Sequence, residues 1–192
     1  MKNEEWDIET GQEETERRIT LPEEITATVS SSSSFHSSCF LYYLGLGTNL
    51  GDKETNLHTA VRELGNRVGE MVSLSSFYAT EPWGFVSEHT FLNAAVSIRT
   101  SLSPLEVLQR TQKIEQDMGR RHKSAGGVYA DRVIDIDLLL CLTPDGKPLH
   151  IQTSQLILPH PLMEERDFVM QPLAEIAPEV VQHFFPSFSS KA

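Results

Sequence analysis

Four stretches of this chain have the apolar patterns of β-strands, in which successive side chains point to opposite faces. Gly45 and Gly47 are expected to break the first stretch into a turn, because glycine weakens the interior of a strand. Pro144 and Gly146 mark another turn after the fourth stretch, and a short strand should follow it. The four predicted strands cover residues 41–46, 72–80, 91–100 and 129–141.

Helical signals lie between and after these strands. Apolar residues at positions i, i+3, i+4 and i+7 predict a helix over residues 53–66. A second helix should begin at Ser103, which can cap it, with Pro104 at the first helical position and Glu106 completing a capping box. A last helix is predicted over residues 168–176. The order β-α-β-β-α-β indicates an α+β, ferredoxin-like fold, with a mainly antiparallel sheet flanked by helices in three α/β/α layers.

The strand predicted over residues 129–141 carries two acids where apolar residues belong. Alternation places Asp135 and Asp137 on one face, together with Val133, Leu139 and Cys141. The opposite face should belong to the core and holds Ile134, Ile136, Leu138 and Leu140. Two neighbouring carboxylates repel unless a cation lies between them, and Mg²⁺ is commonly held by one or two carboxylates plus substrate phosphates. The alternative is a solvated face whose acids form salt bridges with neighbours.

Charge is distributed unevenly along the 192 residues, whose formal net charge is −11. Residues 1–24 hold nine acids and three bases, so the remainder is only mildly acidic. This balance argues against non-specific binding to nucleic acid or to an anionic membrane. The acidic start and the following serine run predict a disordered tail over residues 1–39, and residues 40–192 should form a single domain.

Cysteine content and hydropathy indicate the cellular setting. Cys39 and Cys141 are too few for a disulfide framework or a zinc site. No apolar run reaches the roughly 18 residues that a membrane-spanning helix needs. We therefore expect a cytoplasmic protein without a membrane span, and a monomer.

Basic and polar residues gather around the acidic strand. A basic loop precedes it, and Arg132 lies three residues before Asp135, where an arginine can grip phosphate. Phe91 and Asn93 share a strand face, so they could stack on a flat heterocycle and hydrogen-bond with it. Plainer explanations remain for each feature: a solvated basic loop, and a second packed face of the sheet. No Gly-x-x-x-x-Gly-Lys-Ser/Thr loop occurs, so phosphate chemistry here is not of the P-loop kind.

Seven short motifs occur in an order and spacing that resemble one family. They are Leu44–Gly51, Ser75–Pro82, Phe91–Val96, Gly119–Arg120, Asp131–Asp137, Leu158–His160 and Arg166–Phe168. Together they resemble the 6-hydroxymethyl-7,8-dihydropterin pyrophosphokinases of folate biosynthesis. The resemblance covers about residues 42–180, nearly all of the predicted domain.

This resemblance implies an activity: transfer of pyrophosphate from the co-substrate ATP to the hydroxymethyl oxygen of 6-hydroxymethyl-7,8-dihydropterin, with release of AMP. It implies that Asp135 and Asp137 hold two Mg²⁺ ions and that Arg120 and Arg132 surround the transferred phosphates as catalytic residues. The positions that it assigns to ATP are Gln112, Glu115, His122, Lys123, Tyr129, His160 and Arg166. The positions that it assigns to the pterin are Thr80, Phe91, Asn93 and Phe168, with the two phenylalanines on either side of the ring.

The chain departs from the family pattern at several positions. His122 stands where an arginine is common, Gln155 where some members have an ATP-binding arginine, and Pro161 where some have tyrosine. Glu81 and Trp83 replace a proline and an aliphatic residue beside the pterin.

Two other functions compete with the pyrophosphokinase. One is a ferredoxin-like module that binds a nucleotide or a partner without chemistry. The other is an ordinary kinase that releases ADP. The presence of both aspartates, both arginines and both phenylalanines favours the pyrophosphokinase.

Overall fold

The computed structural model describes residues 38–119 and 130–189. Residues 1–37 of the predicted tail lie outside the described residues. The main elements are β1 (Phe40–Thr48), α2 (Lys53–Arg67), β2 (Glu70–Leu74), β3 (Tyr78–Thr80), β4 (Phe91–Thr100), α3 (Pro104–Asp117) and β5 (Asp135–Leu142). They are followed by β6 (Ile151–Gln152), β7 (Ile157–Leu158), the short 3-10 helix η2 (Met163–Glu165), α4 (Asp167–Ile176), α5 (Pro178–Phe184) and α6 (Pro186–Ser189).

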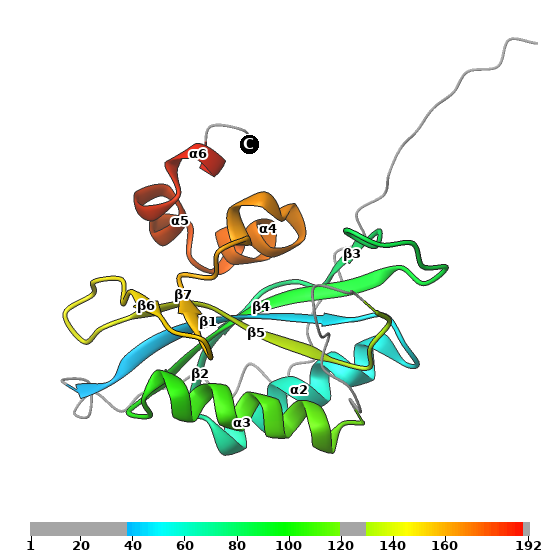
Figure 1. The fold of residues 1–192 in the computed structure, drawn as a ribbon, viewed down its shortest axis with the longest axis horizontal. Coiled ribbons are helices and arrows are strands. Elements are labelled where there is room, and N and C mark those ends of the chain that lie inside the picture. Colours follow the sequence, from blue (N-terminus) through cyan, green and yellow to red (C-terminus); the bar gives the residue numbers. More distant parts are fainter. Residues whose placement is uncertain (1–37, 120–129, 190–192) are drawn as a thin grey trace, which may run out of the picture.

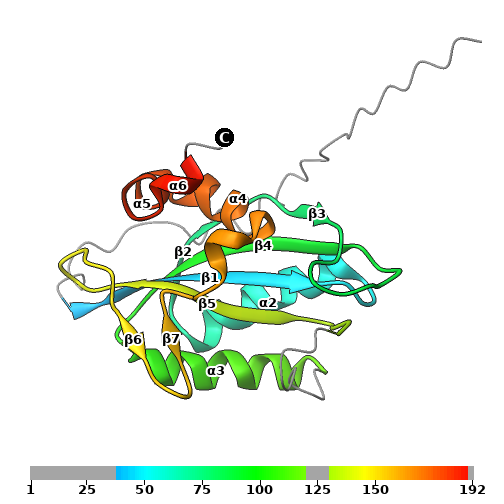
Figure 2. The same cartoon turned by 45° about the horizontal axis from the view of Figure 1, so that its top comes forward.

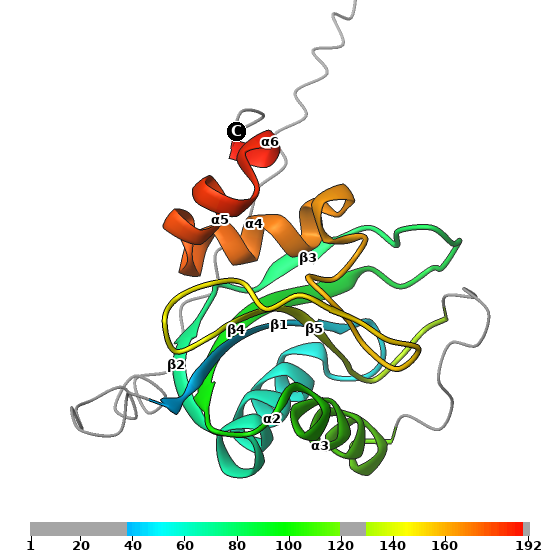
Figure 3. The same ribbon diagram turned by 60° about the vertical axis from the view of Figure 1, so that its left-hand side comes forward.

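The main sheet has the strand order β2-β4-β1-β5, and β3 pairs with β4 farther along the same edge as β2. Every pairing in it is antiparallel. Helices α2 and α3 cover one face of the sheet, while α4, α5 and α6 lie on the other (Figures 1 and 3). Strands β6 and β7 form a separate two-stranded ladder (Figure 2). The predicted three-layer, ferredoxin-like α+β fold is thus confirmed.

Side-chain hydrogen bonds stabilise the starts of both α2 and α3, and the sequence predicted those of α3. Asp52 caps α2, because its carboxylate accepts the N–H of Thr55 at 3.0 Å. Glu106 accepts the backbone N–H of Ser103 at 2.9 Å at the start of α3, as the capping box requires. The last predicted helix is α4, and two short helices that the pattern did not predict, α5 and α6, follow it. Within the parts of the chain that the structure describes, no helix is both long and apolar enough to cross a bilayer.

The strand predicted over residues 72–80 is in fact two strands, β2 and β3. The chain leaves the ladder because the Ser75 hydroxyl accepts the backbone N–H of Ala95 at 2.9 Å, in place of a backbone carbonyl. Phe77 then turns into the core, where it is 3% exposed. The prediction for β1 was also too short: Gly45 and Gly47 do not end the strand, which continues to Thr48.

A β-bulge in β5 makes one part of the predicted alternation wrong. Residues Leu138 and Leu140 pair with consecutive residues of β1, so Leu139 is an extra residue and the faces exchange beyond it. Leu140 therefore packs on the α4 side and Cys141 on the α2 and α3 side, the reverse of the prediction. The carbonyl of Leu139 accepts the N–H of His160 at 2.8 Å, which stabilises the bulged backbone.

Candidate active site

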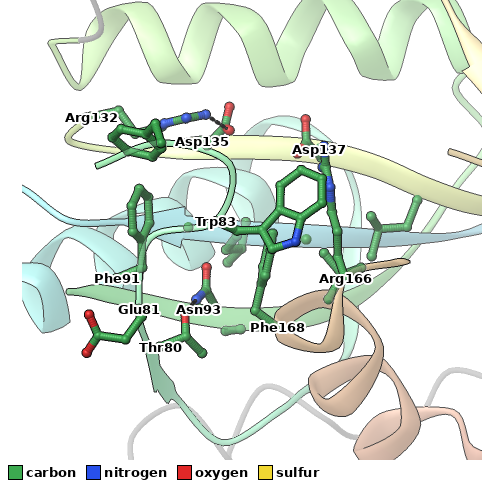
Figure 4. Close-up of a pocket in the computed structure, with 17 residues that line it drawn as sticks. Thr80, Glu81, Trp83, Phe91, Asn93, Arg132, Asp135, Asp137, Arg166 and Phe168 are labelled. Atoms are coloured by element: carbon green, nitrogen blue, oxygen red, sulfur yellow. Dashed lines mark hydrogen bonds and ion pairs between the residues drawn. The ribbon is translucent and has the colours of Figure 1, made fainter. Parts of the chain in front are cut away.

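A pocket opens on the α4 side of the sheet, where Arg166 leads into that helix (Figure 4). Strands β1, β3, β4 and β5 contribute to it, together with the loop between β3 and β4. Its lining consists of Gly45, Leu46, Gly47, Thr80, Glu81, Trp83, Phe85, Phe91, Asn93, Ala94, Arg132, Asp135, Asp137, Leu139, Arg166, Phe168 and Val169.

The floor of the pocket is the backbone of β1, where Gly45 and Gly47 have no side chains. Gly47 lies opposite Asn93 on one side and Asp135 on the other, and Gly45 lies opposite Asp137. A Cβ added to Gly47 would stand 3.0 Å from Asn93 Oδ1, closer than such atoms normally approach. The two glycines therefore leave room above the sheet, between the strand that carries an amide and the strand that carries two acids.

The acidic side of the pocket is formed by β5. Asp135 and Asp137 point from the same face, as the alternation predicted, and both line the pocket. The Arg132 guanidinium donates to Asp135 Oδ2, and these side chains are 11% and 19% exposed. Arg132 Nε also donates to the carbonyl of Ala130 at 3.0 Å, which fixes the direction of the guanidinium. A cation thus accompanies the carboxylates in a partly buried setting, where an unpaired charge is costly.

The opposite side of the pocket is aromatic. The rings of Phe85 and Phe91 meet edge to face, with centroids 6.1 Å apart. The rings of Trp83 and Phe168 are 6.3 Å apart, and the Arg166 guanidinium lies over Trp83, 4.8 Å from the ring centroid. Arg166 extends from this aromatic group toward Asp137 in Figure 4. Such a surface can stack on a flat ring while keeping positive charge nearby.

An amide lies between the aromatic and acidic sides. Asn93 is only 4% exposed, and its Nδ2 donates to Thr80 Oγ1 at 2.7 Å. This bond holds the amide plane in one orientation. A heterocycle that stacks on the aromatic rings would therefore meet a fixed hydrogen-bonding edge.

The structure brings together most of the predicted site residues that it describes. Those that line the pocket are Thr80, Phe91, Asn93, Arg132, Asp135, Asp137, Arg166 and Phe168. Gln112, Glu115 and His160 do not line it. Arg120, His122, Lys123 and Tyr129 lie outside the described residues.

Glu115 is placed behind the two aspartates. It projects from α3 and is 4% exposed, and its Oε1 accepts the N–H of Ile136 at 2.8 Å. Since β5 is an edge strand, this N–H would otherwise lack a ladder partner. Glu115 thus fixes the backbone of β5 at Ile136, the residue between Asp135 and Asp137. Its contact with ATP stays a prediction.

His160 is a neutral side chain at ordinary pH. Burial, together with the nearby Arg166 guanidinium and against an opposing effect of Asp135, lowers its pKa from 6.5 to about 4. Its Nδ1 accepts the N–H of Leu162 at 3.3 Å, which is possible only while that nitrogen carries no proton. The predicted role of His160 in ATP binding therefore concerns an uncharged imidazole.

Sequence reasoning did not assign some of the pocket residues. The sequence identifies Trp83 only as a departure from the family pattern and gives Phe85 no role. A signal was present, because Pro82-Trp-Gly-Phe85 places two aromatic residues in a loop shortly before Phe91. Gly45 and Gly47 were read as a turn, although glycines two apart on a strand also indicate a close approach by a ligand.

The sequence is similar to that of one family of known proteins. The profile of the family described as 7,8-dihydro-6-hydroxymethylpterin-pyrophosphokinase (HPPK) matches residues 43–178. A Porphyromonas gingivalis protein named 2-amino-4-hydroxy-6-hydroxymethyldihydropteridine pyrophosphokinase is 51% identical over 139 residues, covering 72% of this chain and 91% of the relative. A Bacillus subtilis protein of the same name is 45% identical over 139 residues, covering 72% of this chain and 78% of the relative.

Solved structures agree on the fold. A Plasmodium falciparum HPPK-DHPS structure matches with a TM-score of 0.55 and 16% identity, covering 76% of this chain and 43% of that chain. The chain thus spans less than half of that longer protein, and at this identity the likeness concerns the fold alone. The profile match and the relatives of 51% and 45% identity show that the chain belongs to the 7,8-dihydro-6-hydroxymethylpterin-pyrophosphokinase family.

Proposed function

We propose that the protein transfers pyrophosphate from ATP to the hydroxyl of 6-hydroxymethyl-7,8-dihydropterin, giving AMP and the pterin diphosphate, with Mg²⁺ held by Asp135 and Asp137. The observation that carries this proposal is the composition of a single pocket. It joins an aromatic side that suits a flat ring to an acidic and arginine-bearing side that suits a metal-bound triphosphate. A reaction between a heterocyclic alcohol and a nucleotide needs both sides next to each other.

The pterin is expected to lie above the floor glycines. Phe91 and Phe168 would stack on its faces, and the Asn93 amide, oriented by Thr80, would bond its polar edge. This arrangement would direct the hydroxymethyl group toward β5. Holding the two reactants in this way removes much of the entropic part of the barrier.

The acidic side fits magnesium better than a metal held entirely by protein. Among residues 38–119 and 130–189, no group of three or more His, Cys, Asp or Glu side chains could hold a metal ion. Two carboxylates that share a strand face, completed by substrate phosphates, are the donor set that Mg²⁺ accepts. When bound, the proposed two Mg²⁺ ions would neutralise phosphate charge and acidify the attacking hydroxyl.

Arg132 supplies positive charge on the same side. In this structure it donates to Asp135, and its guanidinium lies 5.9 Å from the centroid of the Phe91 ring. That position is between the carboxylates and the proposed ring site. From there the planar guanidinium can donate in parallel to phosphate oxygens and stabilise charge that develops during transfer.

The decisive experiment identifies the nucleotide product. Purified protein is incubated with ATP, Mg²⁺ and the dihydropterin, and the products are separated by ion-exchange chromatography. AMP is the expected product. ADP would instead indicate the ordinary kinase, and the absence of turnover together with measurable pterin binding would indicate a binding module.

Carboxylate variants test the metal assignment. Asp135→Asn and Asp137→Asn should each abolish turnover while leaving the circular dichroism spectrum unchanged, because each removes one ligand charge. Asp145→Asn is the matched control, since Asp145 lies in an exposed turn outside the pocket, and it should keep full activity. A near-normal rate at saturating Mg²⁺ in either pocket variant would contradict the assignment.

A further inference from the structure

A cluster of hydrogen bonds joins three segments at the rim of the pocket. Asn49 comes from the turn between β1 and α2, and Asp131 lies just before β5. Ser87 belongs to the loop between β3 and β4, residues 81–90, here called the aromatic loop because it carries Trp83 and Phe85. The Asp131 carboxylate accepts from Asn49 Nδ2 and from Ser87 Oγ, each at 2.7 Å.

Asn49 holds the backbone of Arg132 from both sides. Its Oδ1 accepts the N–H of Arg132 at 2.8 Å, and its own N–H donates to the Arg132 carbonyl at 3.1 Å. Asn49 is only 3% exposed, so these bonds are shielded from water. The backbone from which the Arg132 side chain starts is therefore fixed by a residue outside the reacting groups.

Ser87 connects the aromatic loop to the same carboxylate. Its hydroxyl donates to Asp131 and accepts the N–H of His89 at 3.1 Å, so it is held at both ends. The two donors lower the pKa of Asp131, which is therefore a charged acceptor at neutral pH. Hydrogen bonds to a charged acceptor are stronger than those between neutral groups.

We propose that Asn49 and Asp131 are positioning residues, which together hold Arg132 and the aromatic loop in one fixed arrangement. The aromatic loop belongs to the proposed pterin side of the pocket and Arg132 to its phosphate side. The Asp131 carboxylate thus links the proposed pterin side of the pocket to its phosphate side. This inference rests on the proposed function, because it assigns Arg132 to the phosphates.

A double-mutant cycle with Arg132 tests the inference. Asp131→Ala should lower kcat roughly 10- to 100-fold, the scale of loss that follows when a catalytic group is misplaced by about 1 Å. In an Arg132→Ala background the same change should have almost no further effect on kcat, because Asp131 acts through the arginine. Equal losses in both backgrounds would overturn the proposal, since they would indicate a general structural role.

A single and a double variant distinguish loss of the linkage from loss of folding. Asn49→Asp places a carboxylate against the Asp131 carboxylate in place of a donor, and should reduce kcat strongly. The double variant with Asn49→Asp and Asp131→Asn restores one donor and one acceptor, and should recover most of the lost kcat. Failure of the pair to recover activity, with a native circular dichroism spectrum, would contradict the linkage.

Ser87→Ala removes the hydroxyl that bonds Asp131, together with the bond that this hydroxyl accepts from His89 within the aromatic loop. It should weaken pterin binding in the wild-type background and have a clearly smaller effect in an Asp131→Ala background, where only the bond with His89 remains to be lost. An equal effect in both backgrounds would count against the linkage. These results are distinct from failure of the proposed function, which would appear as absence of AMP from the wild-type protein.

Discussion

Replacing Gly47 with alanine should weaken pterin binding while changing the stability of the fold very little. Gly47 lies in β1 between Asn93 and Asp135, and an added Cβ would stand 3.0 Å from Asn93 Oδ1. Either the amide or the new methyl group must move by a few tenths of an ångström. The amide is the group that is expected to move, because the strand backbone is held by pairing on both sides.

The size of the effect follows from the bonds of Asn93. Its Nδ2 is bonded to Thr80 Oγ1 at 2.7 Å, so a displaced amide misaligns the edge that it offers to the pterin. A hydrogen bond of this kind contributes about 0.5–1.5 kcal/mol, which corresponds to roughly 2- to 13-fold weaker binding. Alanine is about 0.5–1 kcal/mol more favourable than glycine in a strand interior, and this gain offsets the strain of the displaced amide.

The assay is a calorimetric titration with the dihydropterin, accompanied by urea unfolding of the same samples. Gly45→Ala is the matched control, since it adds the same methyl group to the same strand face. There the three atoms nearest to the new Cβ all belong to Leu139, at an ordinary 3.4 Å or more, so the loss of affinity should be smaller. Unchanged affinity in Gly47→Ala, or an equal loss in Gly45→Ala, would refute the assignment of Asn93 to the pterin.

Three other changes have defined outcomes. Gly69→Ala should destabilise the protein by several kcal/mol in urea unfolding, because its Cβ would collide with the backbone carbonyl of Arg99. Gly65→Ala, at an exposed position of α2 where the new Cβ meets open space, should stabilise it by about 0.5–1 kcal/mol. The pKa of His160 is depressed, so its contribution to stability is complete above pH 6.5 and is lost as pH falls through about 4. The free energy of unfolding of the wild type, relative to that of His160→Asn, should therefore rise by about 2–3 kcal/mol between pH 4 and 7. Deletion of residues 1–38 should leave kcat and KM unchanged, because their composition predicts disorder.

Each of these outcomes can be contradicted directly. Equal stability of the two glycine variants would mean that the approach at Gly69 is relieved by a backbone shift. A constant difference between wild type and His160→Asn across the pH range would mean that the histidine is not buried as the structure has it. A large loss of activity on deletion would show that the tail is part of the enzyme.

The paired aspartates and the helix boundaries could be predicted because they depend on local geometry. Alternation along a strand is set by the covalent backbone, so Asp135 and Asp137 had to share a face wherever that strand lay. The start of α3 at Pro104 likewise follows from a serine, a proline and a glutamate within one turn. The assignment of Phe91, Asn93 and Phe168 to a pterin depended on family resemblance, because the residue pattern alone left a packed sheet face as the alternative for Phe91 and Asn93 and gave Phe168 no role.

Only the tertiary structure decided the features that depend on contacts between distant segments. The bulge at Leu139, which exchanges the faces of β5, requires the partner strand β1 and the N–H of His160. The position of Trp83 over the pocket requires Arg166 and the aromatic loop. Asn49 and Asp131 are 82 residues apart in sequence and meet in one hydrogen bond. The sequence therefore determined which groups can do chemistry, whereas their distances and shielding follow from loop conformations and long-range packing that no local pattern encodes.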